Sequence, residues 1–333
     1  MNEIKDIVSG IKEGNIKPIY FLMGEEPYYI DQISDFIEKN ILDEAEKGFN
    51  QQVMYGRDVG IEDIVSAAKR YPMMAERQVI IVKEAQDLSR NIEKLVAYAE
   101  NPQQTTVLVF NYKYKKLDKR KKLHKAIAKS GLIYESKKLY ENQVYDWIRR
   151  VLSGKKYQIS PKATQMLVEF LGTDLSKISN ELDKLMLILP KETIIDDNHI
   201  EDNIGISKDF NNFELRKAIG DKNILKANRI INYFAENPKN NPLVMTISLL
   251  HSFFAQLLLF HGLKDKSKSA VARAIGVSPY FVDEYFLAAR NYPMRKVAQV
   301  ISFLREADIK SKGVGASQSQ KGILKELLFK ILH

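Results

Sequence analysis

The length, composition and charge of the chain exclude several classes of protein. At 333 residues it is long for one hydrophobic core, so we expect two or three domains. It has no cysteine, which excludes disulfides, thiol catalysis and cysteine-based zinc sites. No apolar run approaches the length of a membrane span, and Met1–Lys5 lacks the apolar core of a signal peptide. We therefore expect a soluble, cytoplasmic protein without a membrane partner.

The first 140 residues alternate short apolar runs with amphipathic segments. The strand candidates lie at Ile19–Met23, Gln52–Tyr55, Val79–Val82, Thr106–Phe110 and Leu132–Glu135. Of these, Val79–Val82 is a continuous, β-branched apolar run that is typical of a strand buried on both faces. Helical periodicity marks Tyr29–Leu42 and Ile61–Arg70 between them. Strands that alternate with helices predict an α/β domain with a parallel sheet between layers of helices.

The turn after the first predicted strand lacks the residues of a phosphate cradle. A P-loop needs G-x-x-x-x-G-K-[ST], whereas the chain reads Gly24-Glu25-Glu26-Pro27, which also fits an ordinary helix start with favourable acidic charge. Lys83 follows the third predicted strand, where an ATPase of this type places a magnesium-ordering aspartate. Both departures argue against ATP hydrolysis. The five histidines are scattered without metal-site spacing, so we expect no cofactor or metal.

A basic run follows the fourth predicted strand. Residues 112–125 hold eight Lys or Arg in fourteen positions, and the net charge of +9 makes nucleic acid the first candidate partner. One interpretation is a solvated helix face, because Leu117, Leu123 and Ile127 recur at roughly helical spacing. The other is contact with DNA phosphates by Lys115, Lys116, Lys119, Arg120, Lys121 and Lys122.

The rest of the chain is predicted to be helical. Helices at Glu141–Leu152, Ser160–Leu171 and Asp174–Leu189 predict a small domain over residues 141–206, and a third, all-α section follows over 207–333. Its stretch Ser248–Phe260 is apolar almost all round, so it must be buried by its own bundle or by neighbouring subunits.

A second basic segment lies near the C-terminus. Lys310 and Lys312 precede Gly313 and Gly315, and the sequence predicts a flexible basic turn between two helices. This turn would either contact primer–template DNA or be a solvated loop.

Five segments, in this order, give the chain a family resemblance. They are Ile19–Ile30, Tyr71–Val82, Leu117–His124, Gly172–Leu185 and Leu304–Lys312. Together they resemble the delta subunit of the bacterial DNA polymerase III clamp loader, a member of the AAA+ clamp-loader group. The resemblance implies an AAA+-like domain at 1–140, a helical lid at 141–206 and a collar at 207–333 that packs into a five-subunit ring.

The resemblance also implies a function. Such a subunit binds no ATP, binds the ring-shaped sliding clamp (beta) and opens one of its interfaces. Its other partners are the gamma/tau and delta prime subunits and primer–template DNA, within the DNA polymerase III holoenzyme, a nucleotidyltransferase complex. The alternatives are an AAA+ NTPase with a degenerate cradle, or a basic AAA+-like DNA-binding scaffold without a clamp partner.

By position, Met73 and Met74 match the apolar pair with which the family holds the clamp, and they follow Tyr71 and Pro72. Pro72 stops the preceding helix, so the methionines should lie exposed where a turn joins a helix to a strand. Methionine suits an adaptable contact in a hydrophobic pocket. The sequence departs here from the leucine and phenylalanine kind of pair found elsewhere in the family. The competing interpretation is that both methionines fold back over the sheet.

Overall fold

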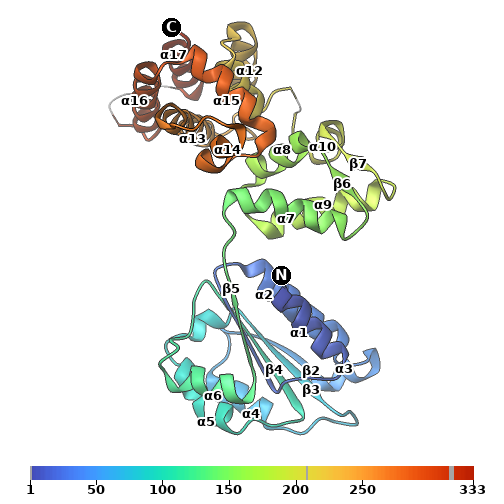
Figure 1. Cartoon of the computed structure of the whole chain (residues 1–333). Helices are drawn as coiled ribbons and strands as arrows, with labels where there is room; N and C mark the ends of the chain where they lie inside the picture. Colours follow the sequence, from blue (N-terminus) through green and yellow to red (C-terminus); the bar gives the residue numbers. More distant parts are fainter. Residues whose placement is uncertain (1, 208, 315–318) are drawn as a thin grey trace. The chain divides into compact units, whose positions relative to one another are not determined.

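The computed structural model describes residues 2–207, 209–314 and 319–333. The chain divides into two compact units, Met1–Leu139 and Tyr140–His333, and each is described by itself (Figure 1).

The first unit is built on a five-stranded parallel sheet. Its strands are β1 (Ile19–Gly24), β2 (Gln51–Tyr55), β3 (Gln78–Lys83), β4 (Thr106–Lys113) and β5 (Leu132–Ser136). They lie in the order β2-β3-β4-β1-β5, so β2 and β5 form the edges. All five predicted strands are confirmed. The apolar runs of β1, β3 and β4 are buried, as a sheet covered on both faces requires, whereas the edge strand β2 is largely exposed.

Helices cover both faces of this sheet (Figure 1). Within residues 2–139, α1 (Asn2–Lys12) precedes β1, and five further helices and two short 3₁₀ turns connect the strands: α2 (Pro27–Asn40), α3 (Glu44–Asn50), α4 (Ile61–Ala68), η1 (Ala85–Leu88), η2 (Ile92–Leu95), α5 (Val96–Glu100) and α6 (Lys122–Ser130). Phe21, Leu108 and Phe110 form one core cluster with Ile64 of α4 and Leu123 of α6. The other face packs against α2. The result is a three-layer α/β unit.

The second unit is mostly helical. Its elements are α7 (Glu141–Ser153), β6 (Gln158–Ile159), α8 (Pro161–Leu171), α9 (Leu175–Ile188), β7 (Ile194–Ile195), α10 (Asp197–Ile204), α11 (Asn212–Gly220), α12 (Ile224–Glu236), α13 (Leu243–Gly262), α14 (Lys268–Ile275), η3 (Pro279–Phe281), α15 (Val282–Asn291), α16 (Met294–Ser311) and α17 (Gln320–Leu332). The parallel pair β6-β7 was not expected, because strands of two residues are too short to show periodicity.

The apolar stretch predicted around Ser248–Phe260 lies in α13, a central helix of this unit. By length and composition α13 could cross a membrane, with a mean hydropathy of 1.9, so the expectation that no segment is long enough was wrong. Its buried side chains, including Leu250, Phe254 and Leu257, belong to the core cluster formed by α11–α17. It packs against α14, α15 and α16, which confirms the interpretation as a helix buried by its own bundle.

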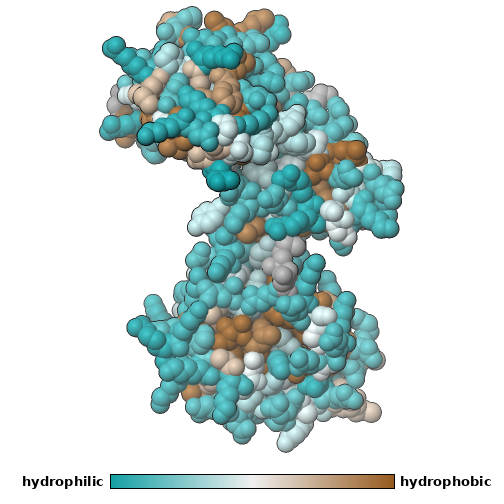
Figure 2. Space-filling view, in the orientation of Figure 1, coloured by the Kyte–Doolittle hydropathy of each residue, from teal (hydrophilic) through white to brown (hydrophobic). Residues whose placement is uncertain are grey.

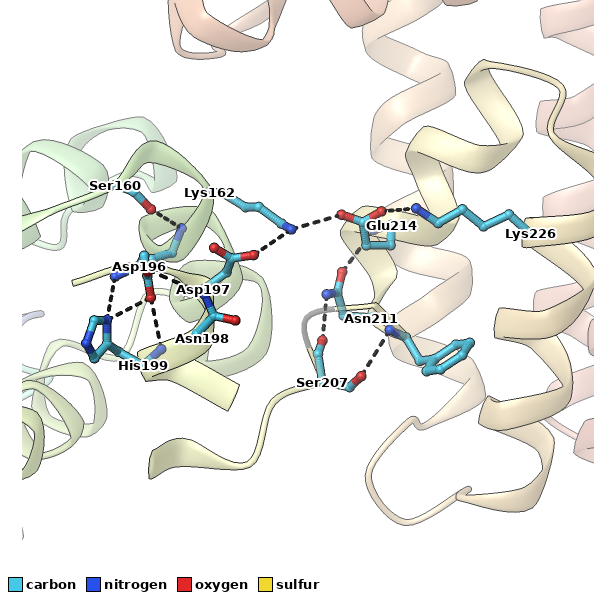
Figure 3. A network of polar contacts seen from close by, with 12 residues as sticks. Ser160, Lys162, Asp196, Asp197, Asn198, His199, Ser207, Asn211, Glu214 and Lys226 are labelled. Carbon is cyan, nitrogen blue, oxygen red and sulfur yellow. Dashed lines mark hydrogen bonds and ion pairs between the residues drawn. The ribbon is translucent and has the colours of Figure 1, made fainter. Parts of the chain in front are cut away.

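A polar network connects four helices of the second unit (Figure 3). Nζ of Lys162 on α8 lies 2.8 Å from Oδ2 of Asp197 on α10 and 3.5 Å from Oε1 of Glu214 on α11. Glu214 also pairs with Lys226 on α12. Because Glu214 is buried, leaving its carboxylate oxygens without partners would be costly in free energy. The network therefore links the helices before residue 205 to the bundle that follows.

Apolar side chains gather on the surface of the second unit where α9 and β7 lie (Figure 2). Leu187, Ile188 and Ile194 are all exposed there. Contiguous exposed apolar groups are typical of a surface that contacts another protein.

Candidate functional site

The loop between α4 and β3 carries the four residues predicted to bind the clamp. Met73 is 62% exposed, Met74 is fully exposed, and Tyr71 beside them also projects into solvent. Pro72 is half-buried. The helix before the loop ends at Ala68, two residues earlier than predicted. The structure therefore brings these residues together on one surface loop, and neither methionine folds back over the sheet.

The backbone of this loop is held in an unusual conformation. Met74 has a φ of +55°, in the left-handed region that residues with a Cβ rarely adopt. At Met73 the backbone N–H donates to Oδ1 of Asn50 at 2.6 Å, and the backbone carbonyl accepts from Nδ2 of Asn50 at 2.9 Å. Asn50 is the last residue of α3 and is 3% exposed. The loop is thus attached to a buried side chain.

More apolar surface lies close to Asn50 in the sequence. Phe49 is 76% exposed, and the edge strand β2 exposes Val53 and Tyr55. The sequence analysis did not single out any of these residues. Phe49 and Asn50 lie more than twenty positions before Met73, and no local pattern links them to the loop.

The backbone N–H groups of the turn after β1 donate hydrogen bonds to other parts of the protein. The N–H of Gly24 donates to the carbonyl of Lys115 at 3.1 Å, and that of Glu25 to the carbonyl of Ser136 at 3.2 Å. The N–H of Glu26 donates to Oγ of Ser136 at 3.1 Å. A phosphate cradle needs these groups free to point at the anion. A Cβ at Gly24 would lie 2.2 Å from the Ser136 carbonyl, so this glycine serves the packing against β5.

The N-terminus of α2 is capped by its own chain. Oε1 of Glu26 accepts a hydrogen bond from the backbone N–H of Tyr28 at 3.3 Å, and Glu26 is 5% exposed. Pro27, the first helical residue, has no N–H to offer. A carboxylate therefore occupies the place where a bound phosphate would meet the positive end of the helix. The interpretation of Glu26 as an acidic helix start is confirmed.

The carboxyl ends of β3 and β4 carry lysines in ion pairs. Nζ of Lys113 lies 3.0 Å from Oδ1 of Asp31 and 2.9 Å from Oε1 of Glu84. Burial opposes the charge on Lys113, but the hydrogen bonds to Glu84 and Asp31 outweigh it and raise the pKa of Lys113. Lys83 pairs with Glu38 at 3.4 Å. Among residues 2–207, 209–314 and 319–333, no three His, Asp or Glu side chains are grouped to hold a metal ion.

The basic run after β4 is mainly a loop. The helix α6 begins only at Lys122, and Leu117 is buried in the segment before it. The predicted helix face is therefore formed only in part, because Leu123 and Ile127 lie on α6 whereas Leu117 precedes it. The chain leaves β4 through Tyr114, whose φ of +61° ends the strand without starting a helix.

Most of the candidate DNA contacts in this run have partners of their own. Those partners are Ser89 for Lys115 (2.8 Å), Glu135 for Lys116 (3.0 Å) and Lys119 (3.6 Å), Asp118 for Arg120 (2.9 Å), and Glu93 for Lys121 (3.6 Å). Exposed pairs of this kind are weak and exchange readily for a phosphate. The geometry is therefore compatible with two interpretations, in which these side chains are either solvated or in contact with DNA phosphates.

The second basic segment differs from the prediction. Lys310 lies on the last turn of α16 and pairs with Glu326 of α17 at 2.7 Å, so it is not in a turn between helices. Lys312 follows the helix and pairs with Asp308 at 2.7 Å. Gly313 adopts a φ of +80° in the turn, and Gly315 lies outside the described residues.

The parallel sheet of order β2-β3-β4-β1-β5, followed by helices to the C-terminus, defines an AAA+-like protein and confirms the predicted fold class. A family model described as DNA polymerase III, delta subunit, matches residues 20–137, and one described as DNA polymerase III delta subunit, C-terminal domain, matches residues 209–330. The chain belongs to the DNA polymerase III delta-subunit family, as the resemblance predicted.

A protein sequence and a solved structure, both from Bacillus subtilis, are similar over almost the whole chain. The DNA polymerase III subunit delta of strain 168 is 25% identical, over 97% of this chain and 94% of that protein. The solved structure of the DNA clamp loader delta protein (YqeN) superposes with a TM-score of 0.57 at 23% identity and covers 99% of each chain. The similarity therefore extends over both units of the fold.

Proposed function

We propose that this chain binds the sliding clamp and opens one of its interfaces, as a subunit of the clamp loader that itself performs no catalysis. The observation that carries the proposal is the exposed pair Met73 and Met74 on a loop held by Asn50. Burying one methionine side chain stabilises a complex by about 1.5–3 kcal/mol. Opening a ring needs only tighter binding to the open form than to the closed form, so no chemical step on this chain is required.

The same proposal assigns ATP to other subunits. The N–H groups of the turn after β1 are already bonded, and Glu26 occupies the N-terminus of α2. An ATP-binding site there would have to break these bonds first. The geometry thus supports a subunit whose access to the clamp is controlled by ATP bound to other subunits, and it speaks against an NTPase with a degenerate cradle.

We propose the rest of the assembly from the family. Residues 1–140 would form the clamp-binding domain, 141–206 the lid and 207–333 the collar that joins the ring. The lysines of the 115–122 run, with Lys310 and Lys312, are the candidate contacts with primer–template DNA. The protein would act in the cytoplasm as part of the DNA polymerase III holoenzyme, a nucleotidyltransferase complex.

Binding of the isolated chain to immobilised sliding clamp tests this function. We expect binding in the absence of nucleotide and no change when magnesium and ATP are added. Capture that requires ATP would favour the NTPase. No capture under either condition, by a chain with a cooperative melting transition, would favour the DNA-binding scaffold without a clamp partner.

A further inference from the structure

Asn50 makes a paired contact with a segment far away in the sequence. Its Oδ1 accepts from the N–H of Met73 at 2.6 Å, and its Nδ2 donates to the carbonyl of Met73 at 2.9 Å. Nδ2 also donates to the carbonyl of Glu46 at 3.2 Å, within α3. The amide is therefore bonded at both ends, and α3 is tied to the loop before β3.

This contact requires an amide. An aspartate would keep the acceptor for the Met73 N–H but would turn a second negative oxygen toward the Met73 carbonyl. An alanine would leave both backbone groups of Met73 without this partner. Because Asn50 is 3% exposed and packed at the end of α3, its side chain has little freedom to move. The bonds therefore fix Met73, and with it the left-handed backbone of Met74.

We propose that Asn50 is a positioning residue for the clamp contact, an inference that rests on the proposed function. By holding the Met73 backbone, it presents both methionine side chains in the conformation that enters an apolar pocket of the clamp. A contact group held in advance loses less conformational freedom on binding, so the complex is tighter than one formed by a loose loop. Asn50 itself does not touch the clamp in this proposal.

The test compares Asn50→Ala with Asn40→Ala in the full-length chain. Asn40 also bonds a backbone carbonyl, that of Phe36 on α2, so its variant is a matched control away from the loop. We expect Asn50→Ala to weaken clamp binding about tenfold and to speed hydrogen exchange at the Met73 amide, since that amide loses its acceptor. Asn40→Ala should leave both measurements unchanged.

The isosteric variant Asn50→Asp supplies a readout that a purely structural role would not move. When protonated, the new carboxyl regains a donor for the Met73 carbonyl. The loss of clamp affinity in Asn50→Asp, measured relative to wild type at the same pH, should become smaller as the pH is lowered from about 8 to about 5. The loss of clamp affinity in Asn50→Ala should not change over this range. This variant also keeps the test decisive if Asn50→Ala does not fold.

Three outcomes separate this inference from the proposed function. Faster exchange at Met73 with clamp affinity within about twofold of wild type would overturn the positioning role while leaving clamp binding intact. So would an affinity loss in Asn50→Asp that is independent of pH. Wild-type affinity in a folded Met73→Ala, Met74→Ala double variant would instead overturn the proposed function, and this inference with it.

Discussion

Met74 is a fully exposed apolar side chain on a backbone conformation that disfavours it. Such a left-handed conformation costs about 1–3 kcal/mol for a residue with a Cβ and persists only when the surroundings impose it. In this structure the two hydrogen bonds between the Asn50 side chain and the Met73 backbone constrain the residue next to Met74. Exposure and strain at one position are features of a binding loop rather than of a packing residue.

The double variant Met73→Ala, Met74→Ala is expected to weaken clamp binding by at least about a hundredfold, since anchor residues cost about 2 kcal/mol or more each on truncation. Both side chains lie in solvent in the free protein, so thermal stability should change by no more than about 0.5 kcal/mol. Titration calorimetry and thermal melting on the same sample measure both quantities. A melting temperature several degrees lower with unchanged clamp affinity would instead assign the methionines to the core.

Glu326 gives a prediction that depends on pH. The hydrogen bond from Lys310, followed by that from Lys330, lowers the pKa of Glu326 to about 2. A carboxyl whose pKa is lowered by folding contributes stability above its unfolded pKa of 4.5 and loses it as the pH falls toward 2. The side chain is a third exposed, so the contribution should be only about 0.5–1 kcal/mol.

Glu326→Gln should therefore be less stable than wild type by this amount at about pH 7, and the difference should shrink progressively as the pH falls from 4.5 toward about 2. Thermal melts of both proteins across this range measure it. A difference that does not change with pH would mean that shape, and not charge, explains the effect.

At the scale of elements, the backbone N–H groups of the turn between β1 and α2 are bonded within the protein. Ser136, at the end of β5, accepts two N–H groups of the turn, and Lys115 accepts a third. These residues belong to strands or loops that neighbour β1 in the sheet. In a P-loop protein the turn after this strand binds phosphate. In this chain the N–H groups of the same turn donate instead to Ser136 and Lys115.

The isolated chain should therefore bind no ATP. Titration with a fluorescent ATP analogue in magnesium is expected to show nothing specific below about millimolar concentration. A saturable signal at micromolar concentration that disappears when magnesium is chelated would contradict the prediction, because it would require the turn after β1 to open.

The loop between β4 and α6 gives a prediction about DNA. If its charges contact phosphates, Lys119→Glu, Lys121→Glu and Lys122→Glu together should weaken primer–template binding by the assembled loader. The salt dependence should flatten by about one unit of slope for each lost contact.

The matched control reverses Lys5, Lys264 and Lys325, three exposed lysines outside the run, and so gives the same net charge. Clamp binding at constant salt should be unchanged in both variants. An unchanged salt slope in the loop variant would assign these lysines to the solvent and to their intramolecular pairs.

At the scale of the whole molecule, the unit Met1–Leu139 contains everything that the proposed clamp contact needs. Its core cluster draws only on residues between Ile19 and Ile133, and Asn50 lies in the same unit as the methionines. A unit with its own core and a completed sheet is expected to fold by itself.

A fragment of residues 1–139 should therefore unfold cooperatively and bind the clamp within about threefold of the full chain. Chemical denaturation and titration against the clamp measure the two properties. A well-folded fragment that does not bind would show that the second unit contributes to the clamp contact.

The sequence by itself determined the elements and the class of fold. Val79–Val82 is buried on both sides because every residue in it is apolar and β-branched, and a parallel sheet is where such a run is stable. The helices α7, α8 and α9 begin and end within one residue of their predicted bounds, since their periodicity and flanking residues are local signals. Pro72 alone indicated that the residues after it leave the helix.

The tertiary structure decided which distant groups meet. Asn50 and Met73 are 23 positions apart, and Glu26 and Ser136 are 110 apart, so no periodic pattern could pair them. The chain path through the sheet brings each pair within hydrogen-bonding distance. The basic run likewise reads as a helix by spacing, yet β4 continues to Lys113 and the chain turns at Tyr114. Periodicity is a local property of the chain, whereas side-chain pairing depends on where the folded backbone places the partner.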